Sequence, residues 1–200
     1  MSEQAILTID TDEELKKIIR QLNSLPNQLK APDVLAKALN ATANEMKRKV
    51  GKKTRKKYAI TDDRILKEKS RGGMYLEKAT GAAPIAKLIS KGAMVDVMAY
   101  MTRKNDSATA AMLKVLNESS LTALEVAGRK AFVTTFNNPD GSKHTAIVQR
   151  RGEKRLPIKK LLAPAVPLIY GKSYQETEAD YYAILQKHIQ RQVNRVLGVA

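Results

Sequence analysis

The order of patterns along the chain predicts an α+β fold. Amphipathic helical patterns fill the first part of the sequence, strand patterns with turn signals fill the middle, and one amphipathic helix closes it. The clearest strand signal is the Pro- and Gly-containing turn 137–141 between two strand patterns, 129–136 and 143–150. We therefore expect N-terminal helices, a central and mostly antiparallel sheet with a long hairpin, and a C-terminal amphipathic helix packed on that sheet.

Residues 1–200 fit a single domain of ordinary size. Its expected parts are a helical segment, a sheet region that contains a variable loop rich in small polar residues, and a C-terminal helix. In that order the parts cover 11–57, 74–168 (loop at about 102–125, with a strand near 111–116) and 173–197.

Two helices are predicted before the sheet. Thr11 and Glu14 form a capping box that opens a helix over 12–25, which Pro26 ends. The second helix covers 33–57, and we expect its apolar face to dock on the strands that follow. Residues three or four apart form that face: Leu35, Leu39, Thr42, Met46 and Val50.

Shorter elements follow the second helix. Residues 60–69 are predicted to form a short helix capped by Thr61 or Asp62, and Gly72 with Gly73 breaks the chain after it. Extended segments are predicted at three places, of which the last is Met-rich and compatible with a helix as well. These segments are 74–80, 84–89 and 93–101.

Prolines shape the region before the last helix. Pro157, Pro164 and Pro167 predict an edge strand over 158–162 followed by an extended bend. Ser173 and Glu176 then form a second capping box. The apolar face of the helix that follows is predicted to contain Tyr182, Leu185, Ile189, Val193 and Val196.

Composition excludes several kinds of chemistry. The absence of Cys rules out disulfides and thiolate sites, and the absence of Trp, with only two Phe, indicates a lean core that neighbouring subunits help to stabilise. No phosphate-binding loop is present, and an enzymatic site would require His144 and His188 to converge with an acid. We expect no catalytic residues, no cofactor and no metal.

No signal peptide or membrane-spanning run is visible, so we expect a soluble protein made in the cytoplasm.

The net charge of +16 is concentrated in two stretches. Eight bases and no acid lie between Lys47 and Lys57, and a second group follows the hairpin. Such density indicates an acidic partner, which would be nucleic acid, an anionic membrane or the acidic face of another protein. The predicted basic surface consists of Lys47, Arg48, Lys49, Lys52, Lys53, Arg55, Lys56, Lys57, Arg151, Lys154, Arg155, Lys159 and Lys160.

Four short motifs resemble those of the phage minor tail protein Z family. They are Ala38-Leu39-Asn40, Tyr58-Ala59-Ile60, Ile158-Lys159-Lys160-Leu161 and Pro164-Ala165-Val166-Pro167. The resemblance covers the chain from about residue 30 to its end. The chain departs from the family pattern at Leu162-Ala163, where a glycine is commoner.

The resemblance implies a structural protein of the head-proximal end of a phage or prophage tail, acting in tail completion, tail termination or head–tail joining. It implies partners as well: copies of the chain in a ring, often sixfold, around the DNA channel, together with tail-tube and neck or connector proteins. The location would be the virion tail, assembled in the bacterial host cytoplasm, with no membrane involved. The alternative, from charge alone, is a cytoplasmic protein that binds DNA without sequence specificity through the basic helix.

Overall fold

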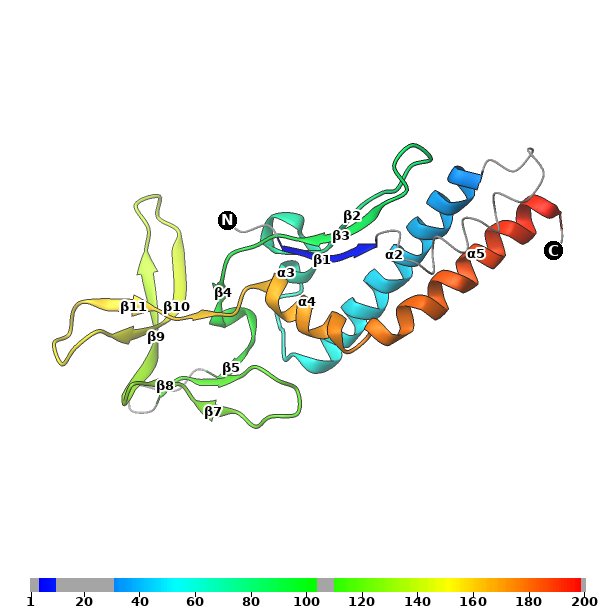
Figure 1. The fold of residues 1–200 in the computed structure, drawn as a ribbon. Coiled ribbons are helices and arrows are strands. Elements are labelled where there is room, and N and C mark those ends of the chain that lie inside the picture. Colours follow the sequence, from blue (N-terminus) through cyan, green and yellow to red (C-terminus); the bar gives the residue numbers. More distant parts are fainter. Residues whose placement is uncertain (1–3, 10–30, 104–109, 199–200) are drawn as a thin grey trace.

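The fold is α+β, as the sequence predicts. The computed structural model describes residues 4–9, 31–103 and 110–198, and the helix expected over 12–25 lies outside them. Helices gather at one end of the molecule and short antiparallel strands form the rest (Figure 1). The strands are divided among several small sheets. No helix among the described ranges is long and apolar enough to cross a membrane.

Helix α2 (Ala31–Lys57) forms the centre of the core. It begins two residues before the predicted position, with Pro32 and Asp33 in its first turn, where both residue types are favourable. The predicted apolar face is confirmed: every member is almost fully buried, and Met46 and Val50 have no exposed surface. The residues of this face are Leu35, Leu39, Thr42, Met46 and Val50.

The partners of α2 differ from the prediction. Its stripe contacts strand β3 (Ala86–Ser90), but its most extensive contact is with helix α5 (Tyr181–Leu197), and helix α4 (Val166–Gln175) is next. The expectation of docking on the following strands is therefore confirmed for β3, but the C-terminal helices make the larger contact with α2. A long helix buries its apolar face most completely against another helix that runs along it.

A small sheet covers another side of α2. Strand β3 lies in its middle, between β1 (Gln4–Ile9) and β2 (Tyr75–Glu77), and both pairings are antiparallel. The side chain of Asn40 on α2 fixes the segment after β2. Its Nδ2 donates to the carbonyl oxygen of Ala79 at 2.9 Å, and its Oδ1 accepts from the Ala79 N–H at 2.8 Å.

The segment between α2 and this sheet contains helix α3 (Arg64–Lys67) and the 3₁₀ turn η1 (Lys69–Arg71). Of the two predicted caps, Asp62 is the one whose side chain accepts from a backbone N–H of the helix, that of Arg64. The break at the glycines is confirmed. Gly72 has a φ of 117°, and a Cβ there would lie 2.6 Å from the Cβ of Val166, so the position requires glycine.

The Met-rich segment 93–101 is partly extended and partly helical. It forms β4 (Val95–Asp96), the 3₁₀ turn η2 (Val97–Ala99) and the start of β5 (Met101–Arg103). Asp96 caps the turn by accepting from the Met98 N–H. Strand β5 continues into an antiparallel sheet with β6 (Met112–Lys114) and β7 (Thr122–Ala123), so part of the predicted variable loop is ordered strand.

The long hairpin is confirmed, and the structure supplies its register. Strand β9 (Arg129–Asn137) pairs with β10 (Lys143–Arg150), from Asn137 opposite Lys143 to Ala131 opposite Gln149. Gly141 in the connecting turn has a φ of 79°, as the turn signal requires. The hairpin belongs to a four-stranded sheet in the order β11-β10-β9-β8, in which β8 is Glu125–Val126 and β11 is Ile158–Lys160.

The C-terminal region differs most from the prediction. The expected edge strand is split into β11 and β12 (Leu162–Ala163), and no extended bend follows it, because α4 begins at Val166. Pro167 lies in the first turn of that helix, where a missing N–H is tolerated. Ser173 is inside α4 and fully buried, and its Oγ accepts from Thr54 Oγ1 at 2.9 Å, so the capping box is wrong.

The last helix therefore starts at Tyr181 and not at 173, after the short turn η3 (Glu178–Asp180). Its buried face is rotated relative to the prediction: Tyr181 and Ile184 join Leu185 and Ile189, whereas Tyr182 is 49% exposed and Val196 45%. Val193 is partly buried against the core. The C-terminal helical region packs on the small sheet through α4, which contacts β1 and β3, and along α2 through α5.

The paired hydrogen bonds of Asn40 lead to a stability prediction. Replacing Asn40 by Ala leaves the N–H and carbonyl of Ala79 without their partner, so the free energy of unfolding should fall by about 1–3 kcal/mol. Denaturant unfolding of the purified protein measures this change. Asn44→Ala is the matched control, because Asn44 is exposed on the same helix and makes one local hydrogen bond. Equal effects of the two substitutions would show that the Asn40 contact does not stabilise the fold.

Candidate interaction surface on the basic helix

The basic half of α2 presents its charges in two neighbouring rows. Residues four apart lie above one another on a helix. Lys49, Lys53 and Lys57 therefore form one row, which we call the inner row. Arg48, Lys52 and Lys56 form the other, the outer row. The two rows meet different surroundings, and this difference decides which charges a partner can reach.

The inner row is neutralised by carboxylates of the C-terminal region. Lys49 Nζ lies 2.9 Å from Asp180 Oδ2, and Lys53 Nζ lies 3.0 Å from Glu176 Oε2. Lys57 donates to the other oxygen of Glu176. Hydrogen bonds from Lys57 and then Lys53 hold the pKa of Glu176 below its usual range, and the Glu176 carboxylate raises the pKa of Lys57.

We call the ion pairs of Lys49, Lys53 and Lys57 with Asp180 and Glu176 the polar seam. The same face of α2 extends this seam toward the N-terminus of the helix. Glu45, one turn before Lys49, has its Oε2 2.9 Å from His188 Nε2 on α5, and its pKa is lowered mainly by that hydrogen bond. The row Glu45, Lys49, Lys53, Lys57 therefore runs beside the C-terminal helices over its whole length. The three lysine side chains are 35–41% exposed, but each is already paired with a carboxylate of the C-terminal region.

The outer row faces solvent. Arg48, Lys52 and Lys56 are exposed, and within the described part of the chain none of them has a carboxylate partner. Arg55, beside this row, lies 3.5 Å from Asp63 Oδ1 and is itself exposed. The outer row is thus the part of the predicted basic surface that α2 offers to another molecule.

A hollow of about 450 Å³ adjoins the outer row. We call it the basic hollow, because its rim carries Lys47, Arg48 and Arg55 from α2 and Lys67 from α3. Asp63 joins two of these cations: its Oδ2 lies 2.9 Å from Lys67 Nζ, and its Oδ1 is the partner of Arg55. These two cations lower the pKa of Asp63, Lys67 most strongly.

The second predicted basic group lies elsewhere. Arg151, Lys154 and Arg155 are exposed in the loop between β10 and β11, at the end of the molecule farthest from α5 (Figure 1). Lys159 is exposed on β11. Lys160 is paired, with its Nζ 2.7 Å from Asp96 Oδ2 and 3.1 Å from His144 Nε2. The structure does not join this group to the rows on α2.

The two histidines do not form a site together. His144 lies on β10 beside Lys160, whereas His188 lies on α5 beside Glu45, so each imidazole has a different partner. Among the described residues no group of three or more His, Cys, Asp or Glu side chains is placed to hold a metal ion.

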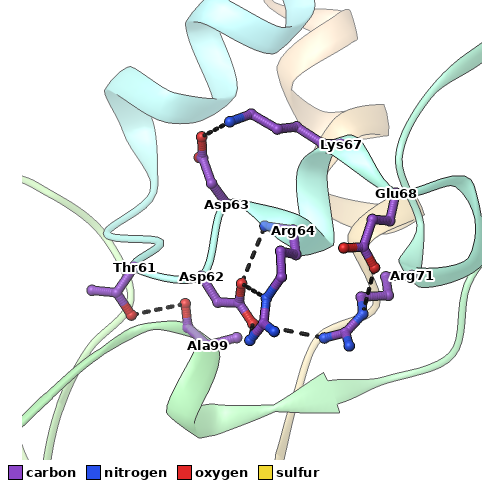
Figure 2. A network of polar contacts seen from close by, with 8 residues as sticks. All are labelled: Thr61, Asp62, Asp63, Arg64, Lys67, Glu68, Arg71 and Ala99. Atoms are coloured by element: carbon purple, nitrogen blue, oxygen red, sulfur yellow. Dashed lines mark hydrogen bonds and ion pairs between the residues drawn. The ribbon is translucent and has the colours of Figure 1, made fainter.

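A larger hollow, about 810 Å³, lies between α3 and η2, and its charged groups are already paired. Figure 2 shows the network on α3 and η1: Asp62 accepts from Arg64 Nε and Nη2 at 2.8 Å, and Arg71 Nε lies 2.7 Å from Glu68. Arg64 accordingly lowers the pKa of Asp62. These contacts hold α3 in place, so we regard the carboxylates as structural.

Sequence reasoning missed the carboxylates that neutralise the inner row. Glu176 fits a capping box by sequence, and no local pattern links Asp180 to Lys49. The pairing of Asp63 with Arg55, beside the outer row, is likewise not indicated by the sequence. Glu45, Lys49, Lys53 and Lys57 do recur every four residues, but such a charged row is also typical of a solvent-exposed helix face, so it does not identify the partner helices.

Comparisons of the chain with protein-family models, with curated proteins and with solved structures find no match. The surface on α2 must therefore be interpreted from its own geometry and charge.

The polar seam leads to a prediction about pH. The pKa of Glu176 in the folded protein lies below its ordinary value of 4.5, so its ion pairs stabilise the fold above that pH. As the pH falls through the folded pKa, this contribution is lost. Glu176→Gln removes it at all pH values. The melting temperature of the variant should therefore be lower than that of the unsubstituted protein near neutral pH, and the difference should shrink toward zero below pH 4.5.

Thermal melting followed by circular dichroism between about pH 7 and pH 3 measures this difference. Glu153→Gln is the control, since Glu153 is exposed and has no ion pair in the described structure. A Glu176→Gln defect that stays constant down to the lowest pH would mean that the seam does not act through ionised Glu176.

Proposed function

We propose that this chain is a structural subunit of a phage or prophage tail that acts at the head-proximal end, in tail completion, termination or head–tail joining. The single observation that carries the proposal is the outer row: three exposed cations without a carboxylate partner among the described residues, on a helix whose opposite side forms the core. A charged row on a rigid support is typical of a docking surface.

The resemblance to the phage minor tail protein Z family supports this proposal, and its residues hold structural positions. Asn40 fixes the segment at Ala79. The junction Tyr58-Ala59-Ile60 ties the end of α2 to the strands, since Ala59 N–H donates to the Val115 carbonyl at 2.9 Å and the Ala59 carbonyl accepts from Met101 N–H at 2.7 Å. Ile158-Lys159-Lys160 is the edge strand β11.

The shape of the hairpin also supports an assembly role. Among the described residues, β8 pairs with β9 only at Arg129 and Lys130, and β11 pairs with β10 only over 148–150, so no described strand covers either edge of the outer half of the hairpin. Phe136 in this half is 37% exposed. Figure 1 shows the hairpin extending away from the helices. A two-stranded ribbon is marginally stable alone and gains from pairing with a neighbouring subunit.

The partners in this proposal are copies of the chain arranged as a ring, which in such tails is often sixfold, and the tail-tube and neck or connector proteins that the ring joins. Native mass measurement of the purified protein, and negative-stain microscopy of the protein mixed with its own tail tubes, test this. A closed oligomer located at one end of the tube is expected. A protein that stays monomeric and never associates with tubes would contradict the proposal.

A charge-reversal variant tests the outer row. Arg48→Glu combined with Lys52→Glu and Lys56→Glu should leave the melting temperature of the subunit within a few degrees of the unsubstituted value, because these side chains make no ion pair in the described structure. The same variant should reduce the yield of completed, infectious tails at least about tenfold, since several charges at a docking surface now repel the partner. Lys53 and Lys57 are left unchanged because they bind Glu176.

The matched control reverses three exposed lysines away from the outer row, Lys37, Lys78 and Lys87. It changes the net charge by the same amount and should not impair tail completion. If both triple variants give normal tails, the outer row is not an assembly surface.

The alternative, DNA binding through the basic helix, has its own test, because the exposed outer row could neutralise phosphates. Titration with a 20-base-pair duplex at about 50 and 200 mM salt would show strong, salt-dependent binding if phosphates are the partner. Absence of binding at the lower salt concentration removes this alternative.

A further inference from the structure

The basic hollow has an uneven charge balance. Four cations stand on its rim, and one carboxylate, that of Asp63, is bound to two of them, Arg55 and Lys67. The other two, Lys47 and Arg48, have no carboxylate partner in the described part of the chain. An incoming carboxylate could bind Lys47 and Arg48 as Asp63 binds Arg55 and Lys67, with the Arg48 guanidinium able to bind it through two parallel hydrogen bonds.

The floor of the hollow is hydrocarbon. Leu66, Met74 and Tyr170 line it, and each is nearly buried. The Tyr170 hydroxyl donates to the Leu66 carbonyl oxygen at 3.0 Å, so it is not free to bind a polar ligand. Burial raises the pKa of this hydroxyl to about 12, and it stays neutral at physiological pH. A ligand therefore meets charge at the rim and apolar surface below it.

We infer that the basic hollow binds an acidic peptide segment of another protein chain. One carboxylate of the segment binds Lys47 and Arg48, further carboxylates neutralise the rim, and an apolar side chain between them contacts the floor. This inference deepens the proposed function, on which it rests, because it names the chemistry of the partner that docks beside the outer row.

Shape favours a peptide over duplex DNA. The hollow lies between two helices, α2 and α3, and a flexible chain can place short carboxylates and one apolar side chain into it. Duplex DNA is a wide rod with phosphates on its outside. Such a rod could contact exposed cations such as Lys52 and Lys56, but its outside presents phosphates and no projecting apolar side chain that could enter the hollow.

Gly51 allows the hollow to be filled without any change of charge. A Cβ added there would lie 3.7 Å from Arg55 Nη1 and 3.8 Å from Met74 Cε, both of which are ordinary contacts. The added Cβ would therefore point toward side chains that line the basic hollow. A larger side chain at this position would occupy part of the hollow. Glycine is also a poor helix former, so the substitution is favourable for α2 itself.

The experiment measures binding of a fluorescently labelled octapeptide by anisotropy, with the full chain at low salt. The peptide carries Asp and Glu on both sides of a central Leu, and its reference has Asn and Gln in place of the acids. The acidic peptide should bind and the reference should not. Lys47→Ala combined with Arg48→Ala should weaken binding at least about tenfold, because two charge-assisted contacts are lost. Gly51→Leu should weaken it by a similar factor.

Two controls accompany these variants. Lys37→Ala removes an exposed charge from the same helix outside the hollow and should change the affinity less than about twofold. Circular dichroism and thermal melting establish that each variant is folded. If Gly51→Leu is not folded, the variant with Lys47→Ala and Arg48→Ala decides the result.

Three results would overturn the inference: no binding of the acidic peptide, normal binding by folded Gly51→Leu, or normal binding by the variant without Lys47 and Arg48. A 20-base-pair duplex that displaces the peptide and binds Gly51→Leu normally would assign the surface to phosphates instead. These titrations use purified protein, so their failure removes the peptide site and leaves the proposed tail role to be decided by the tail assays.

Discussion

The contact between α2 and the C-terminal helices is the constraint on which the rest of the structure depends. Leu39, Met46 and Val50 of α2 are fully buried in the core to which these helices contribute, and burial of such side chains contributes roughly 1.5–3 kcal/mol each. The ion pairs beside them lie at the surface, where single pairs are weak. The apolar stripe therefore supplies most of the stability. The polar seam has a different effect, because matching Lys49 with Asp180 and Lys53 with Glu176 fixes how far the helices are shifted along one another.

The helical period then divides one dense run of bases between two uses. Neighbouring residues of a helix point about 100° apart around its axis, so two rows that are offset by one residue face different directions. The inner row therefore lies beside α4, η3 and α5, while the outer row remains in solvent. A lysine that is already paired with Asp180 or Glu176 must give up that ion pair before it can bind a partner. Any docking through α2 is thus confined to Arg48, Lys52, Lys56 and the basic hollow beside them.

The junction after α2 gives this surface a fixed position relative to the strands. Tyr58 forms a bridge with Leu116 and Ile60 forms one with Tyr100, so the basic end of α2 leads directly into the strand region. Asn117 adds to this attachment, since its Nδ2 lies within hydrogen-bond distance of the carbonyl oxygens of Arg55, Lys56 and Tyr58. The outer row of α2 is therefore held in a fixed position relative to the strands that flank Tyr100 and Leu116.

The sequence by itself determined the elements whose patterns are local. The buried stripe of α2, the break at Gly72 and the hairpin turn around Gly141 follow from side-chain period and backbone conformation, which depend on neighbouring residues alone. Only the tertiary structure decided the partners. Ser173 and Glu176 fit a capping box locally, yet burial against Thr54 and pairing with Lys53 and Lys57 place them at the contact with α2. Long-range burial and charge pairing override a local signal that contributes only about 1 kcal/mol, and they decided which of the basic residues remain exposed.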